Sequence, residues 1–132
     1  YQQLAIIRRL VRDLNFPVEI HGVETVRESD GLAMSSRNRY LTPEERAQAP
    51  AIRAALLAMR SAYQTGETDA AQLLACGSTL LEAKAPSGRI DYLEIVDRNS
   101  MQPLDPVTDD GLIAAAMYFG KARLIDNIEV AS

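Results

Sequence analysis

The chain has 132 residues, which is enough for one ordinary domain, or for one small domain and part of another. Its 47% hydrophobic and 24% charged residues are typical of a globular protein, and its net charge of −4 argues against nucleic acid as a partner. A single cysteine (Cys76) and a single histidine (His21) exclude an internal disulfide and a zinc cluster built from Cys and His alone. We therefore expect a reducing, cytoplasmic setting. No apolar run approaches the roughly 20 residues of a membrane helix, so we expect no membrane partner.

The first predicted element is an amphipathic helix from Gln3 to Leu14, which ends before Pro17. Its apolar face consists of Leu4, Ile7, Val11 and Leu14. Its arginines are interpreted as a solvated face rather than a phosphate patch: Arg8, Arg9 and Arg12. A short strand is predicted over residues 18–23. The helix has no N-cap residue before it and the strand has no parallel neighbour, so we expect further chain to precede Tyr1.

Residues 25–39 are polar and have no sustained helical or strand period, which predicts a loop with a turn at Asp30-Gly31. At about 15 residues the loop is long for a connection, and such loops are usually functional or disordered. We place a domain boundary after it, near Leu41.

Three further helical segments are predicted beyond this boundary. Thr42 and Glu45 form a capping box around Pro43, and Pro50 breaks the resulting helix. A second helix starts at Ala51 and stops at Gly66, and a third runs from Asp69 to just before Pro86. Their predicted core residues are Ile52, Ala55, Leu56, Met59, Tyr63, Leu73, Leu74, Cys76, Leu80 and Leu81.

The last third of the chain is predicted to form a small, mostly antiparallel sheet. Its strands are expected over residues 90–96, 112–119 and 122–130, with a hairpin turn at Gly120-Lys121. The second strand is almost wholly apolar, as in a strand covered on both faces. The third alternates, with Leu124, Asp126 and Ile128 opposite Arg123, Ile125 and Asn127. Asp126 and Asn127 are interpreted as fixing a hairpin or an interdomain contact. The predicted organisation is an α/β unit over residues 1–41 followed by an α+β domain over residues 42–132.

The chemistry of the predicted loop centres on Met34-Ser35-Ser36-Arg37-Asn38. Two adjacent hydroxyls and a guanidinium are suited to binding phosphate. In nucleotidyl transfer, such a cation stabilises the charge that develops on the leaving pyrophosphate. Taken alone, however, a run of this kind is more typical of a solvated loop.

The longer run from Val26 to Leu41 resembles the pantoate–β-alanine ligase family closely and almost without gaps. Tyr1-Gln2-Gln3-Leu4 resembles the segment that follows the Gly-Glu-Lys-Asp motif of that family, and residues 123–127 resemble its C-terminal signature. The resemblance covers the whole chain but only the C-terminal half of the usual length of the family.

The resemblance implies an ATP-dependent ligase that joins (R)-pantoate and β-alanine. ATP and pantoate give pantoyl adenylate and pyrophosphate, and β-alanine then displaces AMP to give pantothenate, with Mg accompanying the ATP. Residues 1–41 would be the last helix–strand unit of a Rossmann-like nucleotide-binding domain, and residues 42–132 a lid-like domain. The residues implied are Ser35, Ser36 and Arg37 for catalysis, these three with Met34 and Val26 for ATP, and Gln3 for pantoate.

The chain also departs from the pattern of the family. The His-x-Gly-His nucleotide motif needs two histidines, and the Gly-Glu-Lys-Asp motif would end just before Tyr1. We therefore expect the chain to be inactive alone, to need an N-terminal half as partner, and to act in a homodimer as the whole enzyme. The alternative is a non-catalytic module that binds a nucleotide or docks on a partner.

Overall fold

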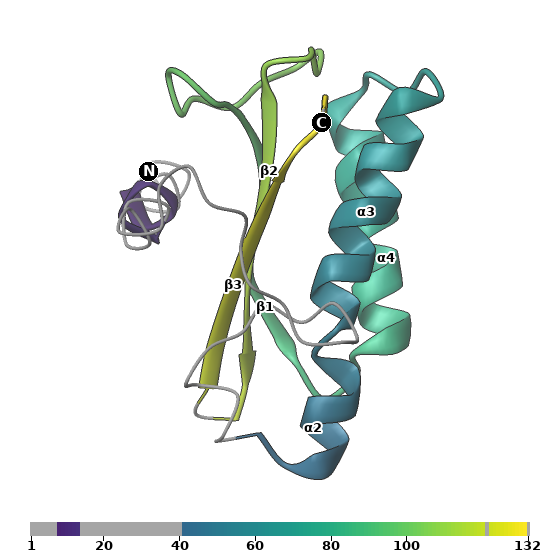
Figure 1. Cartoon of the computed structure of the whole chain (residues 1–132), viewed down its shortest axis with the longest axis vertical. Coiled ribbons are helices and arrows are strands. Elements are labelled where there is room, and N and C mark those ends of the chain that lie inside the picture. The colour runs from purple at the N-terminus through teal and green to yellow at the C-terminus, as the bar shows by residue number, and fades with distance from the viewer. Residues whose placement is uncertain (1–7, 14–40, 121, 132) are drawn as a thin grey trace.

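The computed structural model describes residues 8–13, 41–120 and 122–131 (Figure 1). It contains, in chain order, α2 (Pro43–Gln48), α3 (Ala51–Gln64), α4 (Ala70–Lys84), β1 (Arg89–Asp97), β2 (Gly111–Phe119) and β3 (Ala122–Glu129). Residues 8–13 are also helical. The strand predicted over residues 18–23, the loop over 25–39 and both ends of the first predicted helix lie outside the described residues. None of the described helices is long and apolar enough to cross a membrane.

The capping box predicted at the start of α2 is confirmed. The side chain of Thr42 accepts a hydrogen bond from the backbone N–H of Glu45 at 3.1 Å, and Glu45 Oε1 accepts one from the backbone of Thr42 at 3.0 Å. The predicted break at Pro50 is confirmed as well, because this residue separates α2 from α3. Gly66, with a φ of +120°, follows the end of α3 in a conformation that favours glycine.

Helix α4 begins as predicted, with the Asp69 carboxylate accepting from the backbone N–H groups of Ala71 and Gln72. It buries Leu73, Gly77 and Leu81, which follow one another at four-residue spacing. The prediction that Cys76 is a core residue is wrong, because its side chain is exposed. The residue next to Gly77 is rotated about 100° around the helix axis, away from the buried face.

The sheet has the order β1-β2-β3 and both strand pairs are antiparallel, as predicted. Phe119 pairs with Ala122, which leaves room for a two-residue turn, and Gly120 there has a φ of +60°. The pairing of β1 with β2 shifts register between Ile90 and Tyr92. This irregularity was not predicted from the sequence, and it positions the polar cluster described below.

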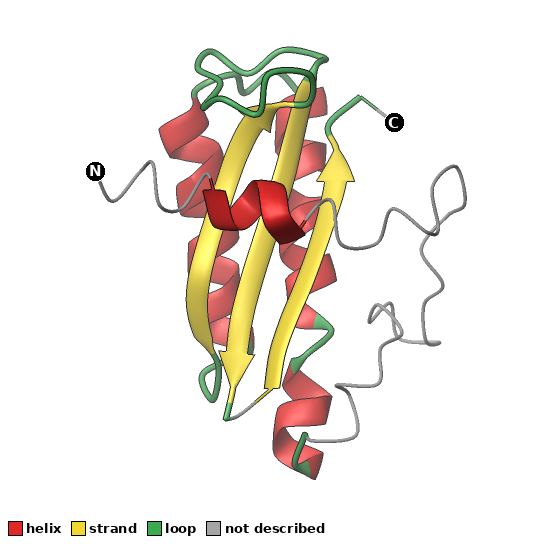
Figure 2. Cartoon of the chain, turned by 90° about the vertical axis from the view of Figure 1, so that its left-hand side faces the viewer, coloured by secondary structure: helices red, strands yellow, loops and turns green. Residues whose placement is uncertain are grey.

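Both faces of the sheet are covered in the described part of the molecule. Helices α3 and α4 pack on the inner face, and residues 8–13 cross the outer face (Figure 2). The inner core includes Ile95, Ile113, Ala115, Met117, Phe119, Leu124 and Ile128 from the sheet. On the outer face, Leu10 packs in a smaller cluster with Tyr92, Val96, Ala114 and Ala116. The apolar sequence of β2 therefore reflects burial on both sides, as predicted.

Candidate functional site

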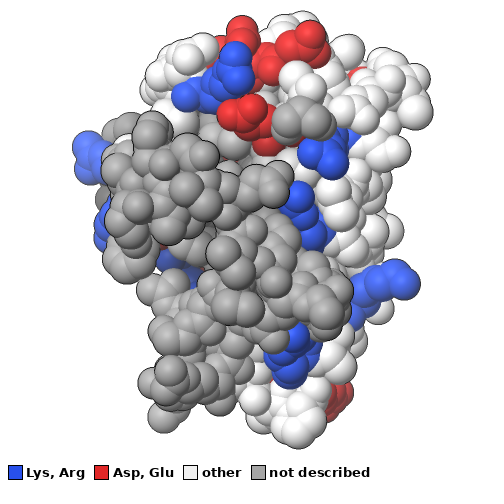
Figure 3. Space-filling view, in the orientation of Figure 1, with Lys and Arg blue, Asp and Glu red and all other residues white. Residues whose placement is uncertain are grey.

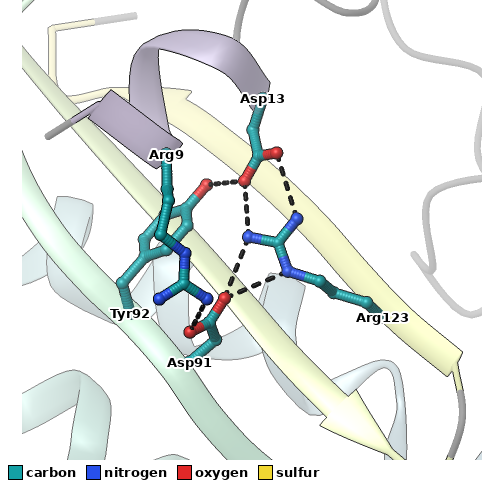
Figure 4. Close-up of polar contacts among 5 residues, drawn as sticks. All are labelled: Arg9, Asp13, Asp91, Tyr92 and Arg123. Carbon is teal, nitrogen blue, oxygen red and sulfur yellow. Dashed lines mark hydrogen bonds and ion pairs between the residues drawn. The ribbon is translucent and has the colours of Figure 1, made fainter. Parts of the chain in front are cut away.

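A cluster of charged residues joins residues 8–13 to the outer face of the sheet (Figure 4). We call it the charged clamp, and its members are Arg9, Asp13, Asp91, Tyr92 and Arg123. The first two come from the helical segment, the next two from β1 and the last from the start of β3. The cluster thus connects segments that lie far apart in the sequence.

The register shift in β1 explains how two consecutive residues reach the clamp. Successive side chains of a regular strand point to opposite faces of the sheet. The shift between Ile90 and Tyr92 leaves Asp91 outside the regular pairing with β2. Asp91 and Tyr92 can therefore both approach residues 8–13, and Figure 4 shows them doing so.

Arg123 is the centre of the clamp. Its two terminal nitrogens donate to the two carboxylate oxygens of Asp13, at 3.0 and 2.7 Å. Its Nε donates to Oδ2 of Asp91 at 3.0 Å. The Tyr92 hydroxyl donates to Asp13 Oδ2 at 2.7 Å, and Arg9 pairs with the other oxygen of Asp91. All four carboxylate oxygens are therefore engaged by donors.

The two carboxylates of the clamp are largely withdrawn from water, so each needs a charged partner. Only 9% of the Asp13 side chain and 7% of the Asp91 side chain are exposed. Burial alone would raise the pKa of Asp13, but the hydrogen bonds from Arg123 and Tyr92 outweigh it and hold that pKa below its usual value. The hydrogen bond to Asp13 likewise raises the pKa of Arg123. Burial, and then the bond to Asp13, raises the pKa of Tyr92.

This arrangement is suited to holding two segments together rather than to moving protons. A general acid or base needs a pKa near the working pH, whereas the carboxylate of Asp13 is held ionised and the Tyr92 hydroxyl protonated. In the described ranges, no group of three or more His, Cys, Asp and Glu side chains could hold a metal ion. The clamp is therefore a structural contact between residues 8–13 and the sheet.

Other charge pairs of the described residues are more exposed. Where β1 leads into β2, side chains of both signs lie together on the surface (Figure 3). Arg98 there approaches Asp110 and Glu129 at 3.5 Å, and all three side chains are about half exposed. Pairs of this kind contribute little to stability, which sets them apart from the clamp.

A cavity of about 400 Å³ lies at the end of α3 and shares no residue with the clamp. It is lined by Tyr63, Gln64, Thr68, Asp109, Val130 and Ala131. The Tyr63 hydroxyl donates to Asp109 at 2.6 Å, and this hydrogen bond raises the pKa of Tyr63. Tyr63, predicted as a core residue, therefore packs on the core only in part and reaches a polar partner with its hydroxyl.

The residues predicted to bind substrates all lie outside the described residues: Gln3, Val26, Met34, Ser35, Ser36 and Arg37. The structure therefore brings none of them together, and their roles stay predictions. Of the two polar residues singled out in the last strand, Asp126 is buried and accepts a hydrogen bond from the backbone of Asn127 at 2.8 Å.

Sequence reasoning missed the clamp. The interpretation of Arg9 as part of a solvated face is wrong, because Arg9 pairs with the buried carboxylate of Asp91. The sequences of β2 and β3 nevertheless contained a signal for a charged contact on the sheet. An apolar β2 indicates two covered faces, and the alternation of β3 places Arg123 opposite Leu124, so its charge would need an acidic partner. Only the tertiary structure identifies that partner as Asp13.

Comparisons with known proteins agree along the whole chain. The family described as Pantoate-beta-alanine ligase matches residues 1–129. Pantothenate synthetase of Akkermansia muciniphila is 55% identical over 130 residues, which are 98% of this chain and 46% of that protein. The enzyme of Desulfovibrio desulfuricans is 55% identical over 128 residues, covering 97% of this chain and 45% of that protein.

The crystal structure of pantothenate synthetase from Thermus thermophilus is similar, with a TM-score of 0.73 and 48% identity. The match covers 100% of this chain and 47% of that protein. The chain therefore spans about half the length of the relatives that it matches. On these matches, the chain belongs to the pantoate–β-alanine ligase family.

Proposed function

We propose that the chain supplies the C-terminal part of an ATP-dependent ligase that joins (R)-pantoate and β-alanine. The pantoate carboxylate attacks the α-phosphorus of ATP, which forms pantoyl adenylate and releases pyrophosphate. The amine of β-alanine then attacks the acyl carbon and displaces AMP, which gives pantothenate. The observation that carries this proposal is the family match over residues 1–129, with relatives that are 55% identical.

The proposed division of labour follows the predicted boundary near Leu41. Residues 1–41 would complete a Rossmann-like nucleotide-binding domain, and residues 42–132 would form a lid-like domain. The packing supports this division. The inner core consists of described residues from α3, α4 and the sheet, whereas residues 8–13 approach from the opposite face.

The proposed site residues are those of the predicted loop and of the predicted first helix. Ser35, Ser36 and Arg37 would stabilise the charge that develops on the pyrophosphate, with Met34 and Val26 against the nucleotide. Gln3 would bind pantoate, since an amide both donates to and accepts from a hydroxy acid. Mg²⁺ would enter with the phosphates of ATP, as part of the substrate.

The proposal also includes the setting of the whole enzyme, a cytoplasmic homodimer that contains an N-terminal half. The chain spans about half of its relatives, so the complementary half would supply the remaining ATP and pantoate contacts. Catalysis of the first step consists mostly of positioning and electrostatics. The chain alone is therefore expected to give no useful turnover.

The test uses a joined protein, in which this chain follows the N-terminal portion of the Akkermansia muciniphila relative. It is incubated with ATP, Mg²⁺, pantoate and β-alanine, and pantothenate is measured by mass spectrometry. Pantothenate should form, and Arg37→Ala should lower kcat by about 10²- to 10³-fold. The matched control is Arg60→Ala on α3, which should leave kcat within about twofold.

Two results would contradict the proposal. A folded joined protein that never forms pantothenate would refute the ligase assignment. Turnover that is unchanged in Arg37→Ala would refute the role of the loop. ATP binding by an inactive joined protein, measured by calorimetry, would favour the non-catalytic module instead.

A further inference from the structure

We propose that Arg123 and Asp91 are positioning residues for the pantoate site, because they fix the helical segment that follows Gln3 against the C-terminal sheet. This inference rests on the proposed function, since it concerns the same site. It adds two residues of the sheet to the residues that are proposed to set the affinity for pantoate.

The first support is the small apolar contact between residues 8–13 and the sheet. Within this segment, Leu10 is the fully buried apolar residue, and it packs against Tyr92, Ala114 and Ala116. A helix held by one apolar side chain can still rotate about its axis. The charged clamp therefore has to supply the orientation.

The second support is the geometry of the clamp. Arg9 and Asp13 are one helical turn apart on residues 8–13, and each is held from the sheet. Asp91 engages Arg9, while Arg123 engages Asp13 with two parallel hydrogen bonds. A planar guanidinium that binds both oxygens of a carboxylate fixes direction as well as distance. This two-pronged contact and the single contact between Arg9 and Asp91 hold the segment at two points one turn apart, which restricts both its rotation and its translation.

The third support is the separation of this contact from the main core. The inner core, formed by α3, α4 and the inner face of the sheet, lies on the other side of the strands from the clamp. A substitution at Arg123 is therefore expected to loosen residues 8–13 while the inner core stays folded. Gln3 precedes Arg9 by six positions in the same predicted helix, so we expect that loosening residues 8–13 would displace Gln3. A misplacement of about 1 Å can cost about 10²-fold in catalysis.

The experiment compares Arg123→Gln, Arg123→Lys and Asp91→Asn in the joined protein, with Arg89→Gln as the matched control. Arg89 also lies on the sheet and stacks over Tyr118 at 4.7 Å, and it makes none of the clamp contacts described above. We expect Arg123→Gln to raise KM for pantoate by about 10-fold or more, with KM for ATP and for β-alanine within about twofold. Arg123→Lys should lie in between, because it keeps the charge but not the two-pronged contact. Arg89→Gln should change none of the three.

The inference is supported if KM for pantoate alone rises while the variant melts at the same temperature as the parent. A general loss of stability would not give that result. Three KM values that rise together, or a KM for pantoate that stays unchanged in all three clamp variants, would overturn the inference. The proposed function would still stand in that case, provided that the parent joined protein makes pantothenate.

A second measurement tests this inference separately from the proposed function, because it does not require an active enzyme. Hydrogen exchange of residues 8–13 is followed in the chain as it is, with and without Arg123→Gln. The inference predicts that protection of these amides is lost, while amides of β2 stay protected. Unchanged protection of residues 8–13 would overturn the clamp whether or not the joined protein is active.

Discussion

Arg123 donates two parallel hydrogen bonds to Asp13, although the two residues are 110 positions apart in the chain. The contact joins the first described segment to the last strand of the sheet. The contact is largely shielded from solvent, since only 9% of the Asp13 side chain and 19% of the Arg123 side chain are exposed. A bidentate pair that is shielded from water is strong and directional. The attachment of residues 8–13 should therefore depend on whether Asp13 is ionised.

The attachment of residues 8–13 should weaken in acid. The pKa of Asp13 is lower in the folded chain than in the unfolded one, where it is about 3.9. The stabilisation is therefore complete above the unfolded value and is lost as the pH falls through the folded value. Hydrogen exchange of residues 8–13, followed from about pH 6 down to about pH 2, measures this loss of stabilisation as a fall in amide protection.

Asp13→Asn is the control for this acid dependence. The variant should show weak protection of residues 8–13 at all pH values, because the ionised partner of Arg123 is gone. Amides of β2 serve as an internal reference in the same sample. An acid transition of residues 8–13 that is the same in Asp13→Asn and in the parent would assign it to another group.

Gly77→Ala should destabilise the packing of α3 on α4. A Cβ at this position would clash with the sulfur of Met59 and would lie 3.1 Å from Leu93 Cδ2. Overpacking of this kind typically costs about 1–3 kcal/mol, which outweighs the better helix propensity of alanine. Urea unfolding measures the difference. Cys76→Ala, on the exposed side of the same helix, is the control and should stay within about 0.5 kcal/mol. Equal stability of the two variants would show that Met59 moves aside without cost.

Asp69→Ala should destabilise α4 by about 1 kcal/mol, because it removes the acceptor for the N–H groups of Ala71 and Gln72. The effect should appear as a lower urea midpoint with an unchanged slope. Gln72→Ala, in the first turn of the same helix, keeps the cap and should stay within about 0.5 kcal/mol of the parent. A loss in Gln72→Ala as large as that in Asp69→Ala would point to the side chain of Gln72 rather than to the cap.

Cys76 should react in the folded protein. Its side chain is exposed on α4, although the sequence places it among apolar helix residues. A thiol reagent such as an aromatic disulfide should modify the single cysteine without denaturant. Modification that occurs only after unfolding would show that the thiol is buried.

The C-terminal part of the fold was predictable because its signals are local. The capping box at Thr42, the break at Pro50 and the turn at Gly120 each follow from a few neighbouring residues, and the structure has all three. The burial of β2 on both faces was predictable from its apolar sequence. Cys76 was predicted wrongly because apolar neighbours surround it, whereas its exposure depends on which face of α4 meets α3.

The clamp was not predictable, because each of its parts depends on a contact between distant segments. The register shift at Asp91 has no local sequence mark, and Arg9 is indistinguishable in sequence from a solvated helix residue. The residues predicted to bind substrates are the opposite case. Ser35, Ser36 and Arg37 stand out in the sequence through a family motif, while they lie outside the described residues.

The most direct test of the account is pantoate-dependent exchange of labelled pyrophosphate into ATP by the joined protein. This exchange reports pantoyl adenylate formation alone, which is the step in which Ser35, Ser36 and Arg37 are proposed to act. We expect exchange that requires pantoate and Mg²⁺ and needs no β-alanine, and that Arg37→Ala slows by about 10²- to 10³-fold. Exchange that is absent from the folded protein, or that proceeds equally without pantoate, would contradict the account.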